Sequence, residues 1–284
     1  MIAWAEGVFG PYPFETAGAT VAGAEFYLAL ETQTIPVFGT YGGDPNAALS
    51  DEALASIEIT LLHELAHQWF GDAVSVQRWR DVWLNEGFAT YAEALWLEET
   101  EGVGARDDML ERLYAASLSA TRFTDPALLP ELTAADVLEA IQDQGQFLDD
   151  ESIDELLGLV DAEDEAALAG IPAETALHAL AESGVPASFF PGLPLLTGDP
   201  GREELFSSSG VYGRGALTLH ALRLEVGDEV FLAILKGWGE RFGDGNAATA
   251  DLVTLAEDVS GQELSPLFDA WLFTAALPEL AGIG

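Results

Sequence analysis

Cysteine is absent from the 284-residue sequence, so the chain has no disulfide framework and no thiolate to act as a nucleophile or a metal ligand. Any bound metal must therefore be held by histidine, aspartate or glutamate side chains. The redox compartment of the protein stays open, because an absence of cysteine is compatible with any compartment.

Basic residues are also scarce: ten Lys and Arg face 49 Asp and Glu, which gives a formal net charge of −39, and Lys236 is the only lysine. A surface of this charge repels the phosphates of nucleic acids and anionic membranes, so we expect neither as a partner. Two interpretations of the charge remain open. One is adaptation to high salt, where counterions screen the self-repulsion, and the other is compositional drift in an acidic lineage.

Long apolar runs are missing too, since no segment approaches the roughly 20 apolar residues of a membrane-spanning helix. No Lys or Arg precedes Arg78, so nothing in this sequence resembles the basic leader of a secretory signal. We predict a soluble protein, with a cytoplasmic location as the working expectation and the oligomeric state open. A hydrophobic fraction of 49% can supply the core of a single domain over residues 1–284.

The order of local patterns predicts an α+β fold, in which a small N-terminal sheet precedes a mostly helical body. The predicted parts are a small β-sheet in 1–50, metal-binding helices in 51–125, an acidic helical insertion in 126–202 and a helical lobe in 203–284. In the lobe, helical patterns occur at 215–226, 228–241, 250–259 and 264–274. The insertion has no basic residue between Arg122 and Arg202, which indicates a solvated acidic face rather than cation binding.

The first predicted helix follows the start signal Ser50-Asp51. Leu54, Leu61 and Leu65 recur along it at helical spacing, and Gly71 is placed to end it. We expect this helix to bury the leucine stripe and to present its histidines along another face.

The stretch HELAHQWFGD starts at residue 63 and places His63 and His67 one helical turn apart, so both imidazoles can reach one ion. Glu64, directly after the first histidine, can reach the attacking water as a general base. Eighteen residues separate His67 from Glu86 in WLNEGFATYAE, which can supply a third ligand from a second helix. Two histidines and one glutamate suit a single zinc ion per chain.

Glu93 lies two helical turns after Glu86 and therefore on nearly the same helix face. It fits two roles, a carboxylate that orients a histidine ring or an ordinary surface glutamate. His220, within LTLHALRL, is predicted to be a hydrogen-bonded structural histidine.

These motifs resemble the aminopeptidase N family of zinc metallopeptidases, in the residues HELAHQWFGD and in WLNEGFATYAE at the family's interval. The resemblance covers most of residues 7–124 and 203–278 and implies a thermolysin-like catalytic domain. Thermolysin-type endopeptidases have the same His-Glu-His-Glu residues, but their interval between the second histidine and the glutamate ligand is one residue longer. Nothing in this sequence corresponds to the family's β-domain over the cleft or to its C-terminal helical domain, so we expect an isolated catalytic domain.

Two further segments are similar to the same family. Residues 28–32, LALET, stand where the family has Gly-x-Met-Glu-Asn, and the resemblance implies that Glu31 binds the free α-amine of the substrate, although the Gly and Asn are lost. In SSGVYGRGALTLHALR, the resemblance implies that Tyr212 donates a hydrogen bond to the oxyanion of the transition state. Without the family resemblance, Glu31 and Tyr212 would each be interpreted as an ordinary structural residue.

The resulting hypothesis is a zinc metallopeptidase that removes N-terminal residues from peptides with a free N-terminus. Two alternatives stay open. One is a broader-specificity or endo-acting zinc peptidase, because the covering domains are missing from this sequence. The other is an inactive zinc-containing fragment or interaction module. Side-chain preference is not determined by the sequence.

Overall fold

The computed structural model describes residues 1–23, 29–39, 50–122, 131–143, 158, 160, 165–173, 175–176, 197–200, 205–274 and 276–281. The α-helices are α1 (Ile2–Phe9), α2 (Asp51–Ala66), α3 (Trp83–Glu101), α4 (Val103–Arg122), α5 (Ala134–Asp143), α8 (Gly215–Val226), α9 (Asp228–Phe242), α10 (Thr249–Ser260) and α11 (Ser265–Leu272). Shorter helical segments are η1 (Trp79–Asp81), η3 (Glu165–Gly170) and the π-helical η5 (Ser208–Arg214). The predicted α+β fold with a helical body is confirmed.

The strands form two small sheets. In the first, β1 (Thr20–Val21), β3 (Val37–Phe38) and β2 (Ala29–Leu30) lie in the order β1-β3-β2, so β2 is an edge strand. Strand β3 pairs in parallel with β1 and antiparallel with β2. In the second, β4 (Val74–Val76) pairs in parallel with β5 (Gly245–Ala247). This second sheet joins the chain just after α2 to the helical lobe.

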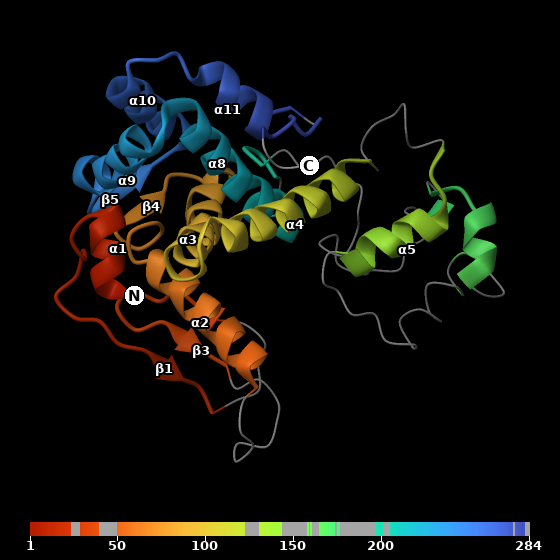
Figure 1. Ribbon diagram of the computed structural model, residues 1–284, viewed down its shortest axis with the longest axis horizontal. Helices are drawn as coiled ribbons and strands as arrows, with labels where there is room; N and C mark the ends of the chain where they lie inside the picture. The colour runs from red at the N-terminus through yellow and green to blue at the C-terminus, as the bar shows by residue number, and fades with distance from the viewer. Residues whose placement is uncertain are drawn as a thin grey trace.

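Helix α3 lies at the centre of the main body and packs against α2, α4, α8 and η5 (Figure 1). Its side chains Trp83, Phe88 and Tyr91 are at most 3% exposed. Helix α8 approaches α3 at two facing glycines: a Cβ on Gly87 would lie 2.9 Å from Cα of Gly215. Only glycine at both positions permits this backbone approach, which brings η5, directly before α8, next to the start of α3.

The predicted helix starts agree well with the structure. The Ser50 side chain caps α2 by accepting a hydrogen bond from the Ala53 N–H at 3.1 Å. The four helices predicted in the lobe are α8, α9, α10 and α11, and the second helix expected to carry WLNEGFATYAE is α3.

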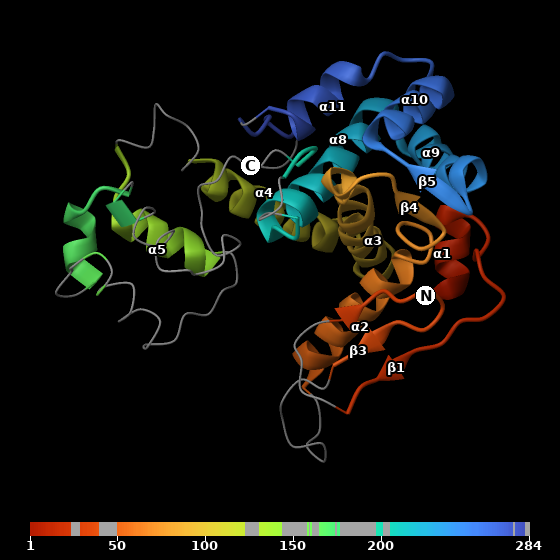
Figure 2. The same ribbon diagram turned by 180° about the vertical axis from the view of Figure 1, so that it is seen from behind.

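The prediction for the buried face of α2 is wrong. Leu54 and Leu61 are 49% and 37% exposed, whereas Leu62 and Ala66 are buried together with His67. The reason is that α3 packs against the histidine side, while the leucine side faces the small first sheet, which runs beside α2 in both views (Figure 1, Figure 2). Two-residue strands cover that side only in part.

Two boundaries also differ from the prediction. Helix α2 ends at Ala66, before Gly71, and the chain then turns so that Gly71 adopts a positive φ of 139°. The N-terminal part predicted as a small sheet begins instead with α1, because Ala5 and Phe9 lie one helical turn apart and bury against the core.

Beyond α4, the described part of the predicted insertion contains α5 and η3, which pack against each other beside the main body (Figure 1). Val137 on α5 and Leu168 on η3 are fully buried. The rest of residues 126–202 lies largely outside the described residues, so the extent of the insertion stays a prediction. Among the described residues, no helix is both long enough and apolar enough to cross a bilayer.

Candidate metal centre

Two histidines and a glutamate converge where the end of α2 meets the first turn of α3. His63 Nε2 and His67 Nε2 lie 3.5 and 3.4 Å from the same atom, Glu86 Oε2. All three ligand atoms lie within 4.8 Å of one another, and no other such group of three occurs among the residues that the structure describes. His67 and Glu86 are buried, while His63 is open to a cavity.

The geometry of this cluster fits a zinc ion. For ligand bonds of about 2.0–2.1 Å, two corners of a tetrahedron around zinc lie about 3.4 Å apart. The two N···O separations at Glu86 match that edge. Two imidazoles and one carboxylate are also a donor set of catalytic zinc sites, which keep their fourth position for water or substrate.

The electrostatics of the cluster favour a cation. Burial alone lowers the pKa of His63, but hydrogen bonds with Glu86 and Glu93 outweigh it and raise that pKa to about 10. Burial opposes ionisation of Glu86, yet its hydrogen bonds with His63 and His67 lower its pKa to about 2. Glu86 is therefore an anion, and surroundings that stabilise a proton on an imidazole also stabilise a metal ion.

The second ring nitrogen of each histidine has its own partner. His63 Nδ1 lies 2.6 Å from Glu93 Oε1, and His67 Nδ1 lies 3.1 Å from the backbone oxygen of Phe70. Such partners hold each ring so that Nε2 faces Glu86. Glu93 thus contacts a histidine of the cluster and is not a free surface carboxylate.

Glu64 is 6% exposed and lies beside the ligand cluster at the wall of the cavity. Its Oε2 is buried and has no hydrogen-bond partner among the described residues. Burial is the main cause that raises the pKa of Glu64; the nearby His67 and His63 oppose this shift and the charge of Glu31 adds to it. The Glu64 carboxylate is therefore protonated more readily than that of a solvent-exposed glutamate.

Tyr212 reaches the cluster from η5. Its ring stacks on that of His63, with ring centroids 5.9 Å apart and an interplanar angle of 14°. Burial is the main cause that raises the pKa of Tyr212, and the charge of Glu86 adds to it, so the hydroxyl stays protonated. Buried Arg214 anchors this segment, because its Nε donates to the Trp271 carbonyl at 2.6 Å. Tyr212 is thus a hydrogen-bond donor held in place.

Glu31 directly follows the edge strand β2. Burial is the main cause that raises the pKa of Glu64 and of Asp72, and the charge of Glu31 adds to both shifts. The Glu31 backbone oxygen also accepts a long hydrogen bond of 3.5 Å from Gln68 Nε2. The backbone of Glu31 is therefore joined to the residue that directly follows His67.

Sequence reasoning missed two contributors to the site. The Phe70 carbonyl could not be foreseen, because any backbone oxygen is a potential acceptor and only the turn after α2 aims this one at His67. Gln68, 1% exposed, was passed over although it sits inside the motif. The available signal was a polar residue directly after a predicted metal ligand, inside the motif.

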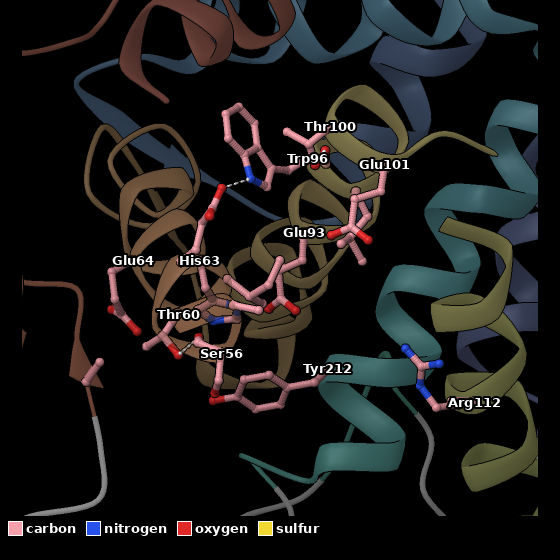
Figure 3. Close-up of a pocket in the computed structure, with 15 residues that line it drawn as sticks. Ser56, Thr60, His63, Glu64, Glu93, Trp96, Thr100, Glu101, Arg112 and Tyr212 are labelled. Atoms are coloured by element: carbon pink, nitrogen blue, oxygen red, sulfur yellow. Dashed lines mark hydrogen bonds and ion pairs between the residues drawn. The ribbon is translucent and has the colours of Figure 1, made fainter. Parts of the chain in front are cut away.

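The cluster opens into a cavity of about 710 Å³. Helices α2, α3 and α4 form its walls, and η5 closes one side with Tyr212 (Figure 3). Four glutamates line it, Glu58, Glu64, Glu93 and Glu101, together with one arginine, Arg112. The arrangement can hold a metal, a proton acceptor and a hydrogen-bond donor around one extended substrate.

His220, predicted to be structural, lies away from this cavity. Its Nδ1 is 2.9 Å from the Tyr91 hydroxyl, and burial lowers its pKa to about 4. It is therefore a neutral, hydrogen-bonded histidine of the core.

Residues 19–134 match the family model described as the Peptidase family M1 domain. The chain is 26% identical over 229 residues to aminopeptidase N of Streptomyces lividans, covering 81% of this chain and 20% of that protein. It is 26% identical over 239 residues to the probable aminopeptidase 1 of Sulfurisphaera tokodaii, covering 82% of this chain and 22% of that protein. The chain thus spans about a fifth of the length of these curated relatives.

Solved structures are similar as well. The crystal structure of an M1 zinc metallopeptidase from Deinococcus radiodurans superposes with a TM-score of 0.59 at 27% identity, covering 98% of this chain and 44% of that one. A variant of that enzyme bound to a Tyr-Ser-Ala substrate gives a TM-score of 0.57 at 28% identity, covering 97% and 43%.

Proposed function

We propose that this chain, which belongs to the M1 peptidase family, is a zinc-dependent aminopeptidase that removes N-terminal residues from short peptides. The observation that carries the proposal is the convergence of His63, His67 and Glu86 on one point, with Glu64 beside them at the wall of the same cavity. Each chain would hold one zinc ion. The relatives' names and the tripeptide bound to the Deinococcus radiodurans variant support the peptide substrate.

Zinc at this site would polarise the scissile carbonyl and make a water molecule acidic enough to attack it near neutral pH. Glu64 would accept the proton of the attacking water and return it to the leaving amine. Its buried Oε2, which has no protein partner among the described residues, supports this role. Its raised pKa keeps the carboxylate basic enough to hold the proton between the two transfers.

Tyr212 would donate a hydrogen bond to the oxyanion that forms when water attacks. Its protonated hydroxyl and its stacking on His63 support this role, because the donor is already positioned before charge develops. Glu31 would pair with the free α-ammonium group of the substrate, since it directly follows the edge strand β2 and its charge acts on Glu64. Glu93 and the Phe70 carbonyl would hold the two imidazoles in their ligand tautomers.

The decisive experiment combines a zinc measurement with peptide hydrolysis on the same sample. We expect one zinc per chain, and we expect a tripeptide with a free N-terminus to be cleaved while its N-acetylated form resists. Glu64→Gln should lower hydrolysis at least about a thousandfold without loss of zinc. Glu99→Gln, at an exposed position of α3, is the matched control and should leave both unchanged.

Each alternative has its own outcome. Equal cleavage of the free and the acetylated peptide would indicate an endo-acting or broader peptidase and would reject the role of Glu31. Zinc at one per chain without turnover of any unblocked peptide would indicate an inactive module. A protein without zinc would reject the proposal altogether.

A further inference from the structure

We infer that Gln68 is a positioning residue that fixes the strand edge carrying Glu31 to the metal-binding helix. The inference rests on the proposed function, because it concerns the amine-binding role given to Glu31. Gln68 follows the metal ligand His67 directly and is 1% exposed. Its side chain contacts the backbone of Glu31 and of Thr34, directly after β2.

Both the nitrogen and the oxygen of the Gln68 side-chain amide form hydrogen bonds. Its Nε2 donates to Asp72 Oδ2 at 2.8 Å and, over 3.5 Å, to the Glu31 backbone oxygen. Its Oε1 accepts from the Thr34 N–H at 2.7 Å and from the Tyr12 hydroxyl at 3.4 Å. The acceptors thus surround the NH₂ group and the donors surround the oxygen, so the amide has one satisfied orientation.

Hydrogen bonds are needed to hold β2 and the turn after it in place, because apolar packing does little to hold them. Strand β2 has only two residues, and its Leu30 is 49% exposed. The turn that follows is strained, since Thr34 has a φ of 66°, in the left-handed region that a β-branched residue rarely adopts. A conformation of this kind persists only when neighbouring contacts hold it, and the hydrogen bond from Gln68 Oε1 reaches Thr34 itself.

Gln68 therefore links two parts of the site that lie far apart in sequence. On one side, His67 is fixed as a ligand by the Phe70 carbonyl. On the other, Glu31 and Thr34 belong to the first sheet, more than 30 residues earlier. The distance between the metal and the amine-binding carboxylate is thereby set by one buried amide.

The experiment uses Gln68→Met, which keeps the length of the side chain and removes its hydrogen bonds without adding charge. Zinc-loaded protein is titrated calorimetrically with leucine hydroxamate and with N-acetyl-leucine hydroxamate, two probes that differ only in the free amine. Amide exchange at Thr34 is measured by NMR on the same proteins. The Gln68→Glu/Asp72→Asn double variant exchanges donor and acceptor while keeping the wild-type net charge. Gln77→Met, at an exposed glutamine, is the control.

We expect Gln68→Met to lower the affinity for leucine hydroxamate about tenfold. The affinity for the acetylated probe should stay within about twofold of the wild-type value, because the metal ligands are untouched. Exchange at Thr34 should become at least about tenfold faster. The double variant, whose carboxylate at position 68 can accept from the Thr34 N–H but cannot donate to the Glu31 carbonyl, should restore the exchange rate at Thr34 to within about threefold. Gln77→Met should change neither quantity.

Wild-type selectivity and wild-type exchange in Gln68→Met would overturn the inference. Equal weakening of both probes would overturn it too, because the damage would then lie at the metal. Failure of the proposed function has a different signature: the wild-type protein itself would bind both probes equally, while exchange at Thr34 would still decide whether Gln68 holds the turn.

A second inference comes from the opposite side of the cavity, and it also rests on the proposed function. Arg112 on α4 lines the cavity across from Glu64 (Figure 3). It is an exposed side chain for which the described residues provide no hydrogen bond or ion pair. The other charged side chains of the lining are glutamates, apart from His63. We propose that Arg112 binds a carboxylate of the substrate downstream of the cleaved bond.

That carboxylate can be the C-terminus of a short peptide or an acidic side chain. A guanidinium pairs with either, because both present two oxygens to its planar donors. Away from His63 and the proposed zinc ion, the other charged side chains of the lining are glutamates, so Arg112 is the lining group that can attract a substrate anion there. Arg112 would therefore select the end of the substrate that Glu31 does not bind.

The test measures peptide binding to zinc-loaded Glu64→Gln protein, in which hydrolysis does not interfere. Three tripeptides are compared: one with a free C-terminus, its C-terminal amide, and an amide with aspartate as the last residue. We expect Arg112→Gln to lower the affinity for the free acid, for the aspartyl amide or for both about tenfold, and to leave the affinity for the plain amide unchanged. Which of the two peptides is affected shows whether the carboxylate comes from the C-terminus or from an acidic side chain. Arg78→Gln, exposed and outside the cavity, is the control.

Binding of the acid and the aspartyl amide that is unaffected by Arg112→Gln would overturn the second inference. Failure of the proposed function would instead appear as absence of hydrolysis by the zinc-loaded wild-type protein, whatever the binding data show.

Discussion

The two sides of the cavity are built in different ways. On the helix side, His63, His67 and Glu86 come from α2 and α3, and α3 is enclosed by other helices on most of its surface. On the sheet side, Glu31 follows a two-residue edge strand whose Leu30 is half exposed. The groups that would break the peptide bond are thus tied to the global fold, whereas the group that would select the peptide end is tied to local structure.

This difference has an energetic consequence. Displacing a metal ligand on α3 requires disruption of core packing around residues such as Trp83 and Tyr91, which are nearly inaccessible to solvent. Displacing Glu31 requires only the loss of the hydrogen bonds that hold the turn after β2. We therefore expect substitutions on the helix side to abolish function and substitutions on the sheet side to alter selectivity.

The largest effect should come from Glu86→Ala, which removes the anionic ligand of the helix side. We expect zinc binding to be lost and hydrolysis to fall at least about a thousandfold, because two imidazoles alone leave the ion weakly held. Zinc content and activity are measured on the same preparation. Glu111→Ala, at an exposed position of α4, should change neither. Full zinc occupancy in Glu86→Ala would show that the ligand set is misassigned.

Tyr212→Phe should have the next largest effect. Loss of one oxyanion donor costs about a hundredfold in kcat, while KM and zinc content should stay near wild type because ground-state contacts persist. Steady-state kinetics with zinc analysis measure this. Tyr114→Phe is the matched control: it removes a hydroxyl that donates to the Pro278 carbonyl at 3.1 Å, on the outside of the cavity. An unchanged kcat in Tyr212→Phe would exclude the oxyanion role.

The helix side was the part that the sequence could predict. His63 and His67 lie four residues apart and Glu86 and Glu93 seven apart, and helical periodicity alone puts each pair on one face. The helix ranges of the lobe were predictable for the same reason, because Gly, Pro and Asp punctuate regular apolar patterns. Helix ranges and residue pairs on one helix face follow from spacing along the chain, so they can be predicted without knowing how the helices pack.

The remainder depends on contacts between distant segments. The periodicity of α2 reveals two stripes but not which one faces α3, so the leucine stripe was assigned to the core and is instead exposed at Leu54 and Leu61. The contact between Gly87 and Gly215 and the bond from Gln68 to Thr34 arise only when the folded chain brings these residues together. Such contacts leave no local pattern that a single sequence would display.

Glu93→Gln tests the carboxylate that contacts the ring of His63, and leaves the three proposed metal ligands in place. The 2.6 Å contact with His63 Nδ1 should survive as a weaker neutral hydrogen bond, so we expect zinc affinity to fall about 10- to 100-fold without loss of the site. Competition with a chelator of known affinity measures this loss. Glu99→Gln, more than three helical turns after Glu86 on α3 and exposed, should bind zinc as the wild type does. Wild-type affinity in Glu93→Gln would return Glu93 to the status of an ordinary surface carboxylate.

Glu31→Gln should have the smallest effect on catalysis and the most selective one. Removing the carboxylate leaves the metal site intact, so kcat should change little, whereas KM for peptides with a free N-terminus should rise about tenfold. The ratio of kcat/KM between free and N-acetylated peptides is the measurement, and it should fall about tenfold as discrimination by the amine is weakened. Glu15→Gln, an exposed acid that precedes the same sheet, removes an equal charge and should preserve the ratio. A fall in zinc content or in kcat comparable to that of Glu86→Ala would contradict the separation of the two sides, because Glu31 would then belong to the bond-breaking machinery.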